Sequence, residues 1–349
     1  MQASELFYEL ETELLQNMVR YLSQGAIGSA RWQLQKIQQL GALKKLNAAT
    51  VEKHIEQAIR LAKKEIRKAG IASARNVDRM SKGNLKLAYV LPAKADPQIV
   101  RTITLWGNLT ANKFNEVGAS LLQRSLAQYA DAATKAVSAH LVGGITGRQA
   151  IAHICTEWAQ TGIGALTDRA GRTWTPEAYA QMLVRTNQRN TVTQVQFDRM
   201  DELGEDLIEV SAHAGARPLC APYQGRIFSR SGKSTQYPPL SSTSYGEPGG
   251  LFGINCGHIA YPYFPGTKKT YQPDNSEKNA EQYKQSQKQR CLERSIRNAK
   301  RELALQKENG DKAAVQRAQI RVEARQKAMR SFIDKTGRTR RYDREQIYE

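Results

Sequence analysis

The stretch from Asp206 to Gly266 constrains the fold most, because it concentrates Gly, Pro, Cys, His and Tyr as no other part of the chain does. Two short apolar runs within it, residues 206–211 and 226–229, have the composition of strands, and turn-forming residues bound them. The remainder is basic and has the periodicity of helices. We therefore expect a small, loop-rich β unit within a mostly helical protein.

Helices are predicted on both sides of this stretch. Residues 3–24, 29–40 and 98–140 carry apolar residues at helical spacing. Thr50 is a suitable N-cap and Gly70 a suitable stop, which predicts a separate helix between them. Thr175-Pro176 begins a long helix that ends at Leu203, before Gly204.

The predicted fold class is α+β and mostly helical. We divide the chain into an N-terminal helical region, 1–143, a central α+β domain, 144–268, and a basic C-terminal helical hairpin, 269–349. In the central domain the β-containing unit is expected to pack on the long helix.

The chain carries 52 Lys and Arg against 33 Asp and Glu, a formal net charge of +19. Such a field favours an anionic partner, which is nucleic acid, a membrane surface or an acidic protein surface, whereas the alternative is that the charge serves solubility alone. Residues 271–349 hold 20 basic and 12 acidic residues, so this tail is the expected place for phosphate contacts. The alternative is an ordinary solvated hairpin of helices. The candidate nucleic-acid-binding residues are Arg290, Arg294, Arg297, Lys300, Arg301, Arg338, Arg340 and Arg341.

His213, Cys220, Cys256 and His258 form the candidate metal set. Two His and two Cys can complete the tetrahedral coordination of structural zinc, and Gly257 permits the turn that Cys256 and His258 need to bind together. A structural zinc ion is the one cofactor that the sequence suggests, although the spacing matches no compact zinc finger. The alternative is that both cysteines are buried small residues and both histidines form hydrogen bonds in loops.

No catalytic motif is complete. The chain has no Walker-type phosphate loop, no Gly-x-Ser-x-Gly and no His-Glu-x-x-His. Ser242-Thr-Ser244 is similar to a motif of ADP-ribosyltransferases, but no Glu-x-Glu follows it. Cys220 could act as a nucleophile with His213 or His258 as base, yet no third orienting group is identifiable. We therefore assign no catalytic residues.

The motifs of the central stretch resemble the signature of the phage minor capsid protein 2 family. They are "EVSAHAGARPLCAPYQGRIFS" (209–229), "YGEPGG" (245–250), "NCGH" (255–258) and "YPYFPG" (261–266). This family is related to the Mu F-type minor head, or head-morphogenesis, proteins of tailed phages and prophages. The resemblance covers residues 145–345. Its members often carry His in place of Cys220, an exchange that preserves zinc ligation.

The resemblance implies a non-enzymatic minor head protein, located in the virion at the capsid interior or portal vertex. It implies the portal protein, the major capsid protein or a scaffold as partners, and phage DNA as a further one. The alternatives are an enzyme delivered from the head, such as a metal-dependent hydrolase, a nuclease or an ADP-ribosyltransferase-like toxin, and a free DNA-binding protein.

The cysteines and the hydropathy set the expected compartment. Four widely spaced cysteines do not form the dense pattern of a secreted disulfide scaffold, so we expect the host cytoplasm during assembly. We expect no signal peptide and no membrane partner, since no apolar run is long enough to span a bilayer.

Overall fold

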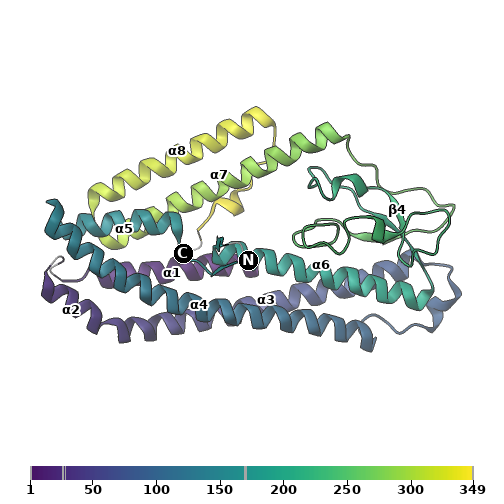
Figure 1. Ribbon diagram of the computed structural model, residues 1–349, viewed down its shortest axis with the longest axis horizontal. Helices are drawn as coiled ribbons and strands as arrows, with labels where there is room; N and C mark the ends of the chain where they lie inside the picture. Colours follow the sequence, from purple (N-terminus) through teal and green to yellow (C-terminus); the bar gives the residue numbers. More distant parts are fainter. Residues whose placement is uncertain (1, 26, 28, 169–170, 348–349) are drawn as a thin grey trace. The chain divides into compact units, whose positions relative to one another are not determined.

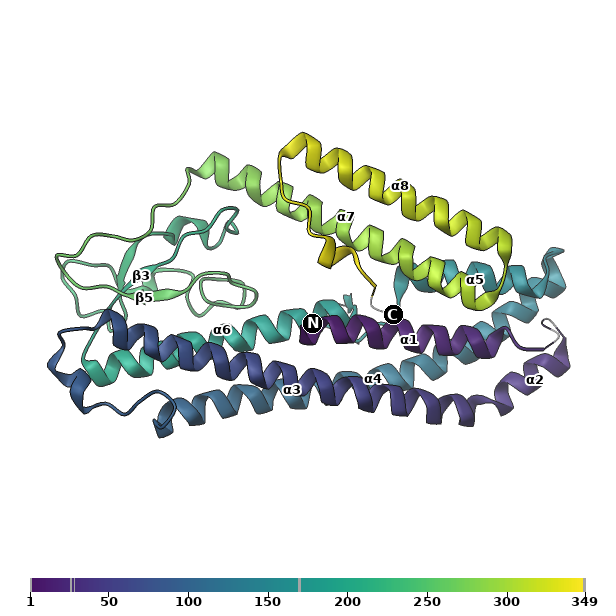
Figure 2. The ribbon, with the colours of Figure 1, turned by 180° about the vertical axis from the view of Figure 1, so that it is seen from behind.

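The protein is described by a computed structural model (Figure 1; Figure 2) that covers residues 2–25, 27, 29–168 and 171–347. It forms two compact units, each made from separated stretches of chain. Unit 1 comprises Met1–Ala58, Lys113–Ala180 and Lys288–Glu349, and unit 2 comprises Ile59–Asn112 and Gln181–Gln287. Several long helices contribute a segment to each unit.

The helices among the described residues are α1 (Ala3–Leu22), α2 (Ala30–Gln38), α3 (Leu40–Met80), α4 (Pro97–Gly143), α5 (Gly147–Thr161), α6 (Pro176–Leu203), α7 (Ser276–Asn309) and α8 (Lys312–Thr336). The strands are β1 (Leu166–Thr167), β2 (Thr173–Trp174), β3 (Leu207–Val210), β4 (Ile227–Ser229) and β5 (Ala260–Pro262). The prediction of a mostly helical α+β fold is confirmed. Among the described residues, no helix is both long enough and apolar enough to cross a membrane.

Unit 1 is mostly helical, and most side chains of its helix α1 are buried. Phe7 of α1 meets Phe114 edge to face, with ring centroids 4.6 Å apart, and both rings are buried. α5 begins with a capping box, in which the hydroxyl of Thr146 accepts a hydrogen bond from the backbone N–H of Gln149. β1 and β2 pair as an antiparallel hairpin, and residues 169–170 between them lie outside the described part.

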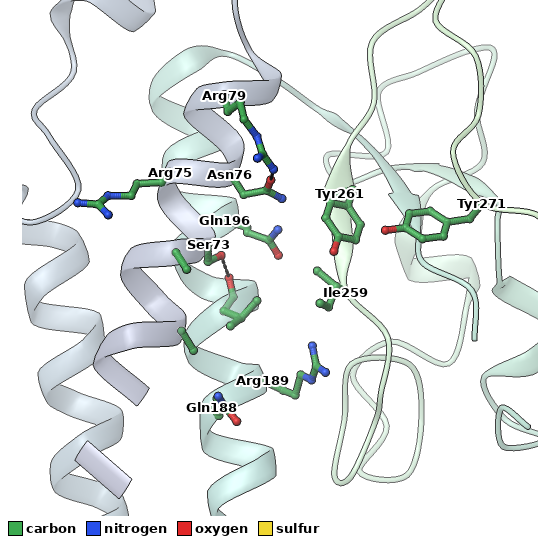
Figure 3. Close-up of a pocket in the computed structure, with 13 residues that line it drawn as sticks. Ser73, Arg75, Asn76, Arg79, Gln188, Arg189, Gln196, Ile259, Tyr261 and Tyr271 are labelled. Atoms are coloured by element: carbon green, nitrogen blue, oxygen red, sulfur yellow. Dashed lines mark hydrogen bonds between the residues drawn. The ribbon is translucent and has the colours of Figure 1, made fainter. Parts of the chain in front are cut away.

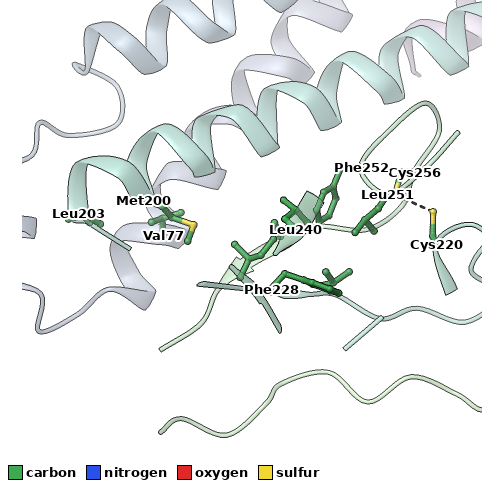
Figure 4. Close-up of a cluster of buried hydrophobic side chains, with 12 residues drawn as sticks. Val77, Met200, Leu203, Cys220, Phe228, Leu240, Leu251, Phe252 and Cys256 are labelled. Carbon is green, nitrogen blue, oxygen red and sulfur yellow. Dashed lines mark hydrogen bonds between the residues drawn. The ribbon is translucent and has the colours of Figure 1, made fainter. Parts of the chain in front are cut away.

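Unit 2 contains the β unit. Its three-stranded sheet has the order β4-β3-β5, and both pairings are antiparallel. Met200 of α6 and Val77 of α3 belong to the same buried hydrophobic cluster as Ile208 and Phe228 of the sheet, and Figure 4 shows the cluster. The prediction that the β unit packs on the long helix is confirmed, and α6 has the predicted ends.

A buried arginine, Arg199, connects three parts of unit 2. Its guanidinium is ion-paired with Asp78 of α3 at 2.9 Å, with Asp96 just before α4 at 3.2 Å and with Glu202 at 2.6 Å. It also donates to the carbonyl oxygen of Leu91 at 2.7 Å. A fully buried cation needs such compensation, because an unpaired charge is costly outside water.

The predicted helix boundaries at Thr50 and Gly70 are wrong. Both residues lie inside α3, which runs unbroken from Leu40 to Met80. The hydroxyl of Thr50 bonds back to the carbonyl of Leu46 instead of capping a helix. Gly70 serves close packing, since a Cβ there would lie 2.7 Å from the side chain of Ile103 on α4.

β5 was not predicted. It contains Pro262, which cannot donate to a neighbouring strand. Because β5 lies at the sheet edge, only one of its sides pairs with another strand, and the proline is tolerated. The division of the chain into three domains at residues 143 and 268 stays a prediction. It concerns whether each of the three stretches folds on its own.

Candidate metal centre

Two loops of unit 2 bring the candidate ligands together. Cys220 lies at the start of a short 3-10 turn, Ala221–Tyr223, between β3 and β4. Cys256 and His258 lie just before β5, where the backbone turns sharply. Phe252 and Asn255 both adopt left-handed φ values, 59° and 56°, which ordinary side chains rarely take. The local fold therefore directs both loops toward one buried point.

Cys220, Cys256 and His258 form a compact, buried group. The two Sγ atoms lie 3.9 Å apart, and Sγ of Cys256 lies 3.4 Å from Nδ1 of His258. Each side chain offers one ligand atom, and these atoms are within 4.8 Å of one another. Tetrahedral zinc with ordinary bond lengths separates two sulfurs by about 3.8 Å and a sulfur and a nitrogen by about 3.6 Å. The observed spacings fit such an ion.

A buried glutamine, Gln224, orients His258. Its Oε1 accepts a hydrogen bond from Nε2 of His258 at 3.2 Å and another from the backbone N–H of His213 at 2.7 Å. With Nε2 carrying the proton, Nδ1 keeps its lone pair directed at Cys256. Zinc-binding histidines are commonly held by this kind of outer hydrogen bond.

Hydrogen bonds and burial set the thiol chemistry of the pair. The pKa of Cys256 is lowered, first because the Cys220 thiol donates toward its sulfur and also because the backbone N–H of His258 donates to it, although burial opposes the shift. The pKa of Cys220 is raised by the same partnership with Cys256 and by burial. The guanidinium of Arg217 lies 3.7 Å from Sγ of Cys220 and opposes that rise. Cys256 is thus the sulfur that is more readily deprotonated for a metal.

His213 lies outside this compact group. Its ring stacks on that of His258, with centroids 4.4 Å apart and planes inclined by 30°, and it is exposed. Although the residue is exposed, partial desolvation of its ring and then the neighbouring His258 lower its pKa. Gly257 leaves room for it, since a Cβ there would lie 2.8 Å from Nε2 of His213. The structure therefore brings three of the four predicted ligands together and places the fourth beside them.

The surroundings suit a structural ion better than a catalytic one. Cys256 and Cys220 are almost fully buried, so neither sulfur is open to a substrate. The nearby acid Glu209 accepts hydrogen bonds from the backbone N–H groups of Thr270 and Tyr271, at 3.0 and 2.8 Å, and is not free to act as a base. A catalytic zinc needs an open position and a proton acceptor.

Gln224 and Arg217 were not predicted from the sequence. Both lie within the motif 209–229, but a single glutamine or arginine in a loop carries no spacing signal that distinguishes it. Their roles depend on contacts that form only in the folded loop, where Gln224 reaches His258 and Arg217 reaches Cys220.

The candidate nucleic-acid contacts of α7 and the C-terminal tail fall into three groups. Arg301 is buried and ion-paired with Glu11 at 2.7 Å, so it cannot reach a phosphate while unit 1 is folded. Arg297, Lys300, Arg338 and Arg340 are half-buried, and bind Glu177, Gln346, Gln289 and Glu345, respectively. Arg290, Arg294 and Arg341 are exposed. Only the last group is available for phosphate without rearrangement.

Comparison with known proteins finds one protein family and two phage proteins that are similar to this chain. The profile of the family described as phage minor capsid protein 2 matches residues 1–334. A "Structural protein" of Lactococcus phage LL-H is 27% identical over 335 residues, covering 91% of this chain and 89% of the relative. A "Structural protein" of Lactococcus phage mv4 is 31% identical over 117 residues, covering 32% of this chain and 93% of the relative. No solved structure matches.

Proposed function

This chain belongs to the phage minor capsid protein 2 family, and from that membership we propose that it acts in head assembly at the portal vertex, without catalytic activity. It is a phage structural protein of the capsid. The proposed partners are the portal protein and the major capsid or scaffold protein. Residence in the capsid interior next to DNA is compatible with its net charge of +19.

We further propose that Cys220, Cys256 and His258 hold a zinc ion that fixes the loops of unit 2. The observation that supports this is the compact, buried arrangement of the three ligand atoms, with Gln224 orienting the imidazole. Structural zinc is normally four-coordinate. His213 is the proposed fourth ligand, reached by rotation of its side chain from its position against His258.

The proposed role of zinc is mechanical. The segment between β4 and β5 is long and rich in turns, and its position depends on few strand pairings. An ion that joins the loop after β3 to the loop before β5 would hold this segment in one conformation for docking on a partner. The bound ion would supply no reaction chemistry.

Particle fractionation tests the assembly role. Proheads and mature particles from a phage carrying the wild-type gene should contain the chain, and a Cys256→Ser phage should incorporate less of it. Cys291→Ser is the matched control, because Cys291 is exposed on α7. Absence of the wild-type chain from every particle fraction would refute the assembly role. Equal incorporation of both variants would refute the link between the zinc site and docking.

A contact with packaged DNA is a second proposal, supported by the exposed arginines Arg290, Arg294 and Arg341. Replacing all three with Gln should reduce the slope of log affinity for duplex DNA against log salt concentration, since each phosphate contact releases counterions. An unchanged slope would exclude these side chains as DNA contacts.

A further inference from the structure

A cavity of about 830 Å³ lies within unit 2, and none of the four candidate metal ligands lines it. It is lined by α3, α6, the residues around β5 and Tyr271 (Figure 3). Its size is in the usual range of ligand pockets. Its lining includes Arg75, Arg79 and Arg189 but no Asp or Glu. The charged residues of the lining are therefore all cationic.

Arg189 is the most informative residue of this wall. It extends from α6 into the cavity, below Ile259 in Figure 3. Among the described residues it has no ion-pair or hydrogen-bond partner, although Arg199 on the same helix has several. Burial lowers the pKa of Arg189, because desolvation penalises the charged guanidinium. An anion bound beside it would offset that cost.

A second, independent feature is an unsatisfied buried amide. Gln196 is 1% exposed, and its Oε1 has no hydrogen-bond partner among the described residues. Figure 3 shows this amide directed toward Tyr261 and Ile259. An unpaired buried oxygen is unfavourable, because it has lost its hydrogen bonds to water and gained none in the protein. A ligand that donates a hydrogen bond here would remove that penalty.

The two cations and the amide have an order along the cavity. In Figure 3, Arg79 and Arg189 lie at opposite ends, with Gln196 between them. Arg79 donates a hydrogen bond to Oδ1 of Asn76 at 2.5 Å. The guanidinium of Arg75 points away from the cavity in Figure 3. A ligand with a negative charge at each end and hydrogen-bonding groups in the middle fits this order.

Aromatic side chains form the facing wall. Tyr261 and Tyr271 lie side by side, with ring centroids 5.4 Å apart and planes inclined by 32°. Tyrosine rings in a basic groove provide stacking surfaces for nucleobases, and a glutamine amide can bond to a base edge. Acidic peptides have the negative charges but nothing that calls for a stacking surface.

We propose that this pocket binds one nucleoside unit of a single-stranded nucleic acid, with its base near Gln196 and Tyr261 and its flanking phosphates near Arg79 and Arg189. The same chemistry could come from a free nucleotide, so the experiment must separate the two sources. This binding would be an activity beyond the proposed head-assembly function, at residues other than the four candidate metal ligands.

The test uses the full-length protein and a short, fluorescently labelled single-stranded DNA, with fluorescence anisotropy as the readout. Unlabelled duplex DNA in excess occupies contacts that depend on charge alone. We expect Arg189→Gln to weaken binding about tenfold, the loss expected for one charge-assisted hydrogen bond. Arg67→Gln is the matched control: it removes the same charge from an exposed position of α3 that does not line the pocket, and we expect less than about twofold weakening.

Competition identifies the source of the ligand. Adenosine 3′,5′-bisphosphate should displace the strand at lower concentration than adenosine 5′-monophosphate, because only the former has a phosphate at both ends. Inorganic phosphate should compete poorly. If adenosine 5′-monophosphate competes as well as the bisphosphate, the ligand is a free nucleotide and not a strand. That result would overturn the proposal.

Other outcomes would overturn it as well. Equal weakening by Arg189→Gln and Arg67→Gln would mean that net charge, not the pocket, holds the strand. Displacement by polyglutamate but not by the bisphosphate would assign the pocket to an acidic peptide. Thermal unfolding verifies that each variant is folded. If Arg189→Gln does not fold, Arg79→Gln takes its place, since Arg79 is exposed.

Discussion

Removal of the Arg199 side chain should destabilise unit 2 strongly. The side chain is 0% exposed and compensates Asp96, whose side chain is 5% exposed, and the more open Asp78 and Glu202. Arg199→Met keeps much of the apolar volume but leaves the Asp96 charge and the Leu91 carbonyl without their partner. Breaking a buried ion pair from one side costs about 3–5 kcal/mol, and we expect a loss in that range.

A compensating substitution separates charge from packing. Asp96→Asn in the Arg199→Met background removes the uncompensated buried charge, so it should restore part of the lost stability. The control is Lys278→Met, also in unit 2, which breaks the ion pair with Asp274 between side chains 61% and 29% exposed. Exposed pairs contribute about 0–1 kcal/mol, so this variant should be close to wild type.

The assay is urea unfolding followed by circular dichroism, with hydrogen exchange of the α3 and α6 amides to assign the loss to unit 2. Local exchange is needed because two units need not unfold in one step. A loss of less than about 1 kcal/mol for Arg199→Met would refute the reasoning, because such a value is typical of exposed pairs. A further loss on adding Asp96→Asn would also refute it.

Three more predictions follow from the same packing and electrostatics. In urea unfolding, Gly70→Ala should destabilise unit 2 by about 1–3 kcal/mol, because the new Cβ would lie 2.7 Å from the facing isoleucine and overpack the contact. Gly107→Ala should instead stabilise unit 2 by up to about 1 kcal/mol, because its new Cβ meets only a flexible lysine at 3.4 Å. Although burial opposes the shift, hydrogen bonds from two serines lower the pKa of Asp206. The stabilisation that Asp206 contributes is therefore present above the unfolded-state pKa of about 3.9 and is lost as the pH falls below it. Asp206→Asn should flatten the dependence of the unfolding free energy on pH in acid, and an unaltered dependence would contradict this. Gly257→Ala should displace the His213 ring, 2.8 Å from the new Cβ, and weaken zinc binding in a competition titration with a chromophoric chelator; unchanged affinity would exclude His213 as a ligand.

Local signals predicted much of the fold. The ends of α6 follow from Thr175-Pro176 and Gly204, which act within one turn of the helix. The predicted helix end at Gly70 is wrong because this glycine serves a tertiary contact. It leaves room for a side chain from α4, and no local sequence pattern encodes such a contact. For the same reason β5, with a proline at its end, could not be recognised before its pairing with β3 was known.

The candidate site was predictable in composition but not in geometry. Residue types alone singled out Cys220, Cys256 and His258, which the fold brings together. They could not predict that Gln224 orients the imidazole. Nor could charge alone identify Arg301 as a buried partner of a glutamate, since the pair joins residues far apart in the chain.

Native mass spectrometry of the full-length protein, purified without chelator, tests the zinc centre most directly. We predict one zinc ion per wild-type chain and per Cys291→Ser chain, and none per Cys256→Ser chain. A wild-type chain whose mass equals that of the bare polypeptide after incubation with zinc would contradict the account, as would a Cys256→Ser chain that retains the ion.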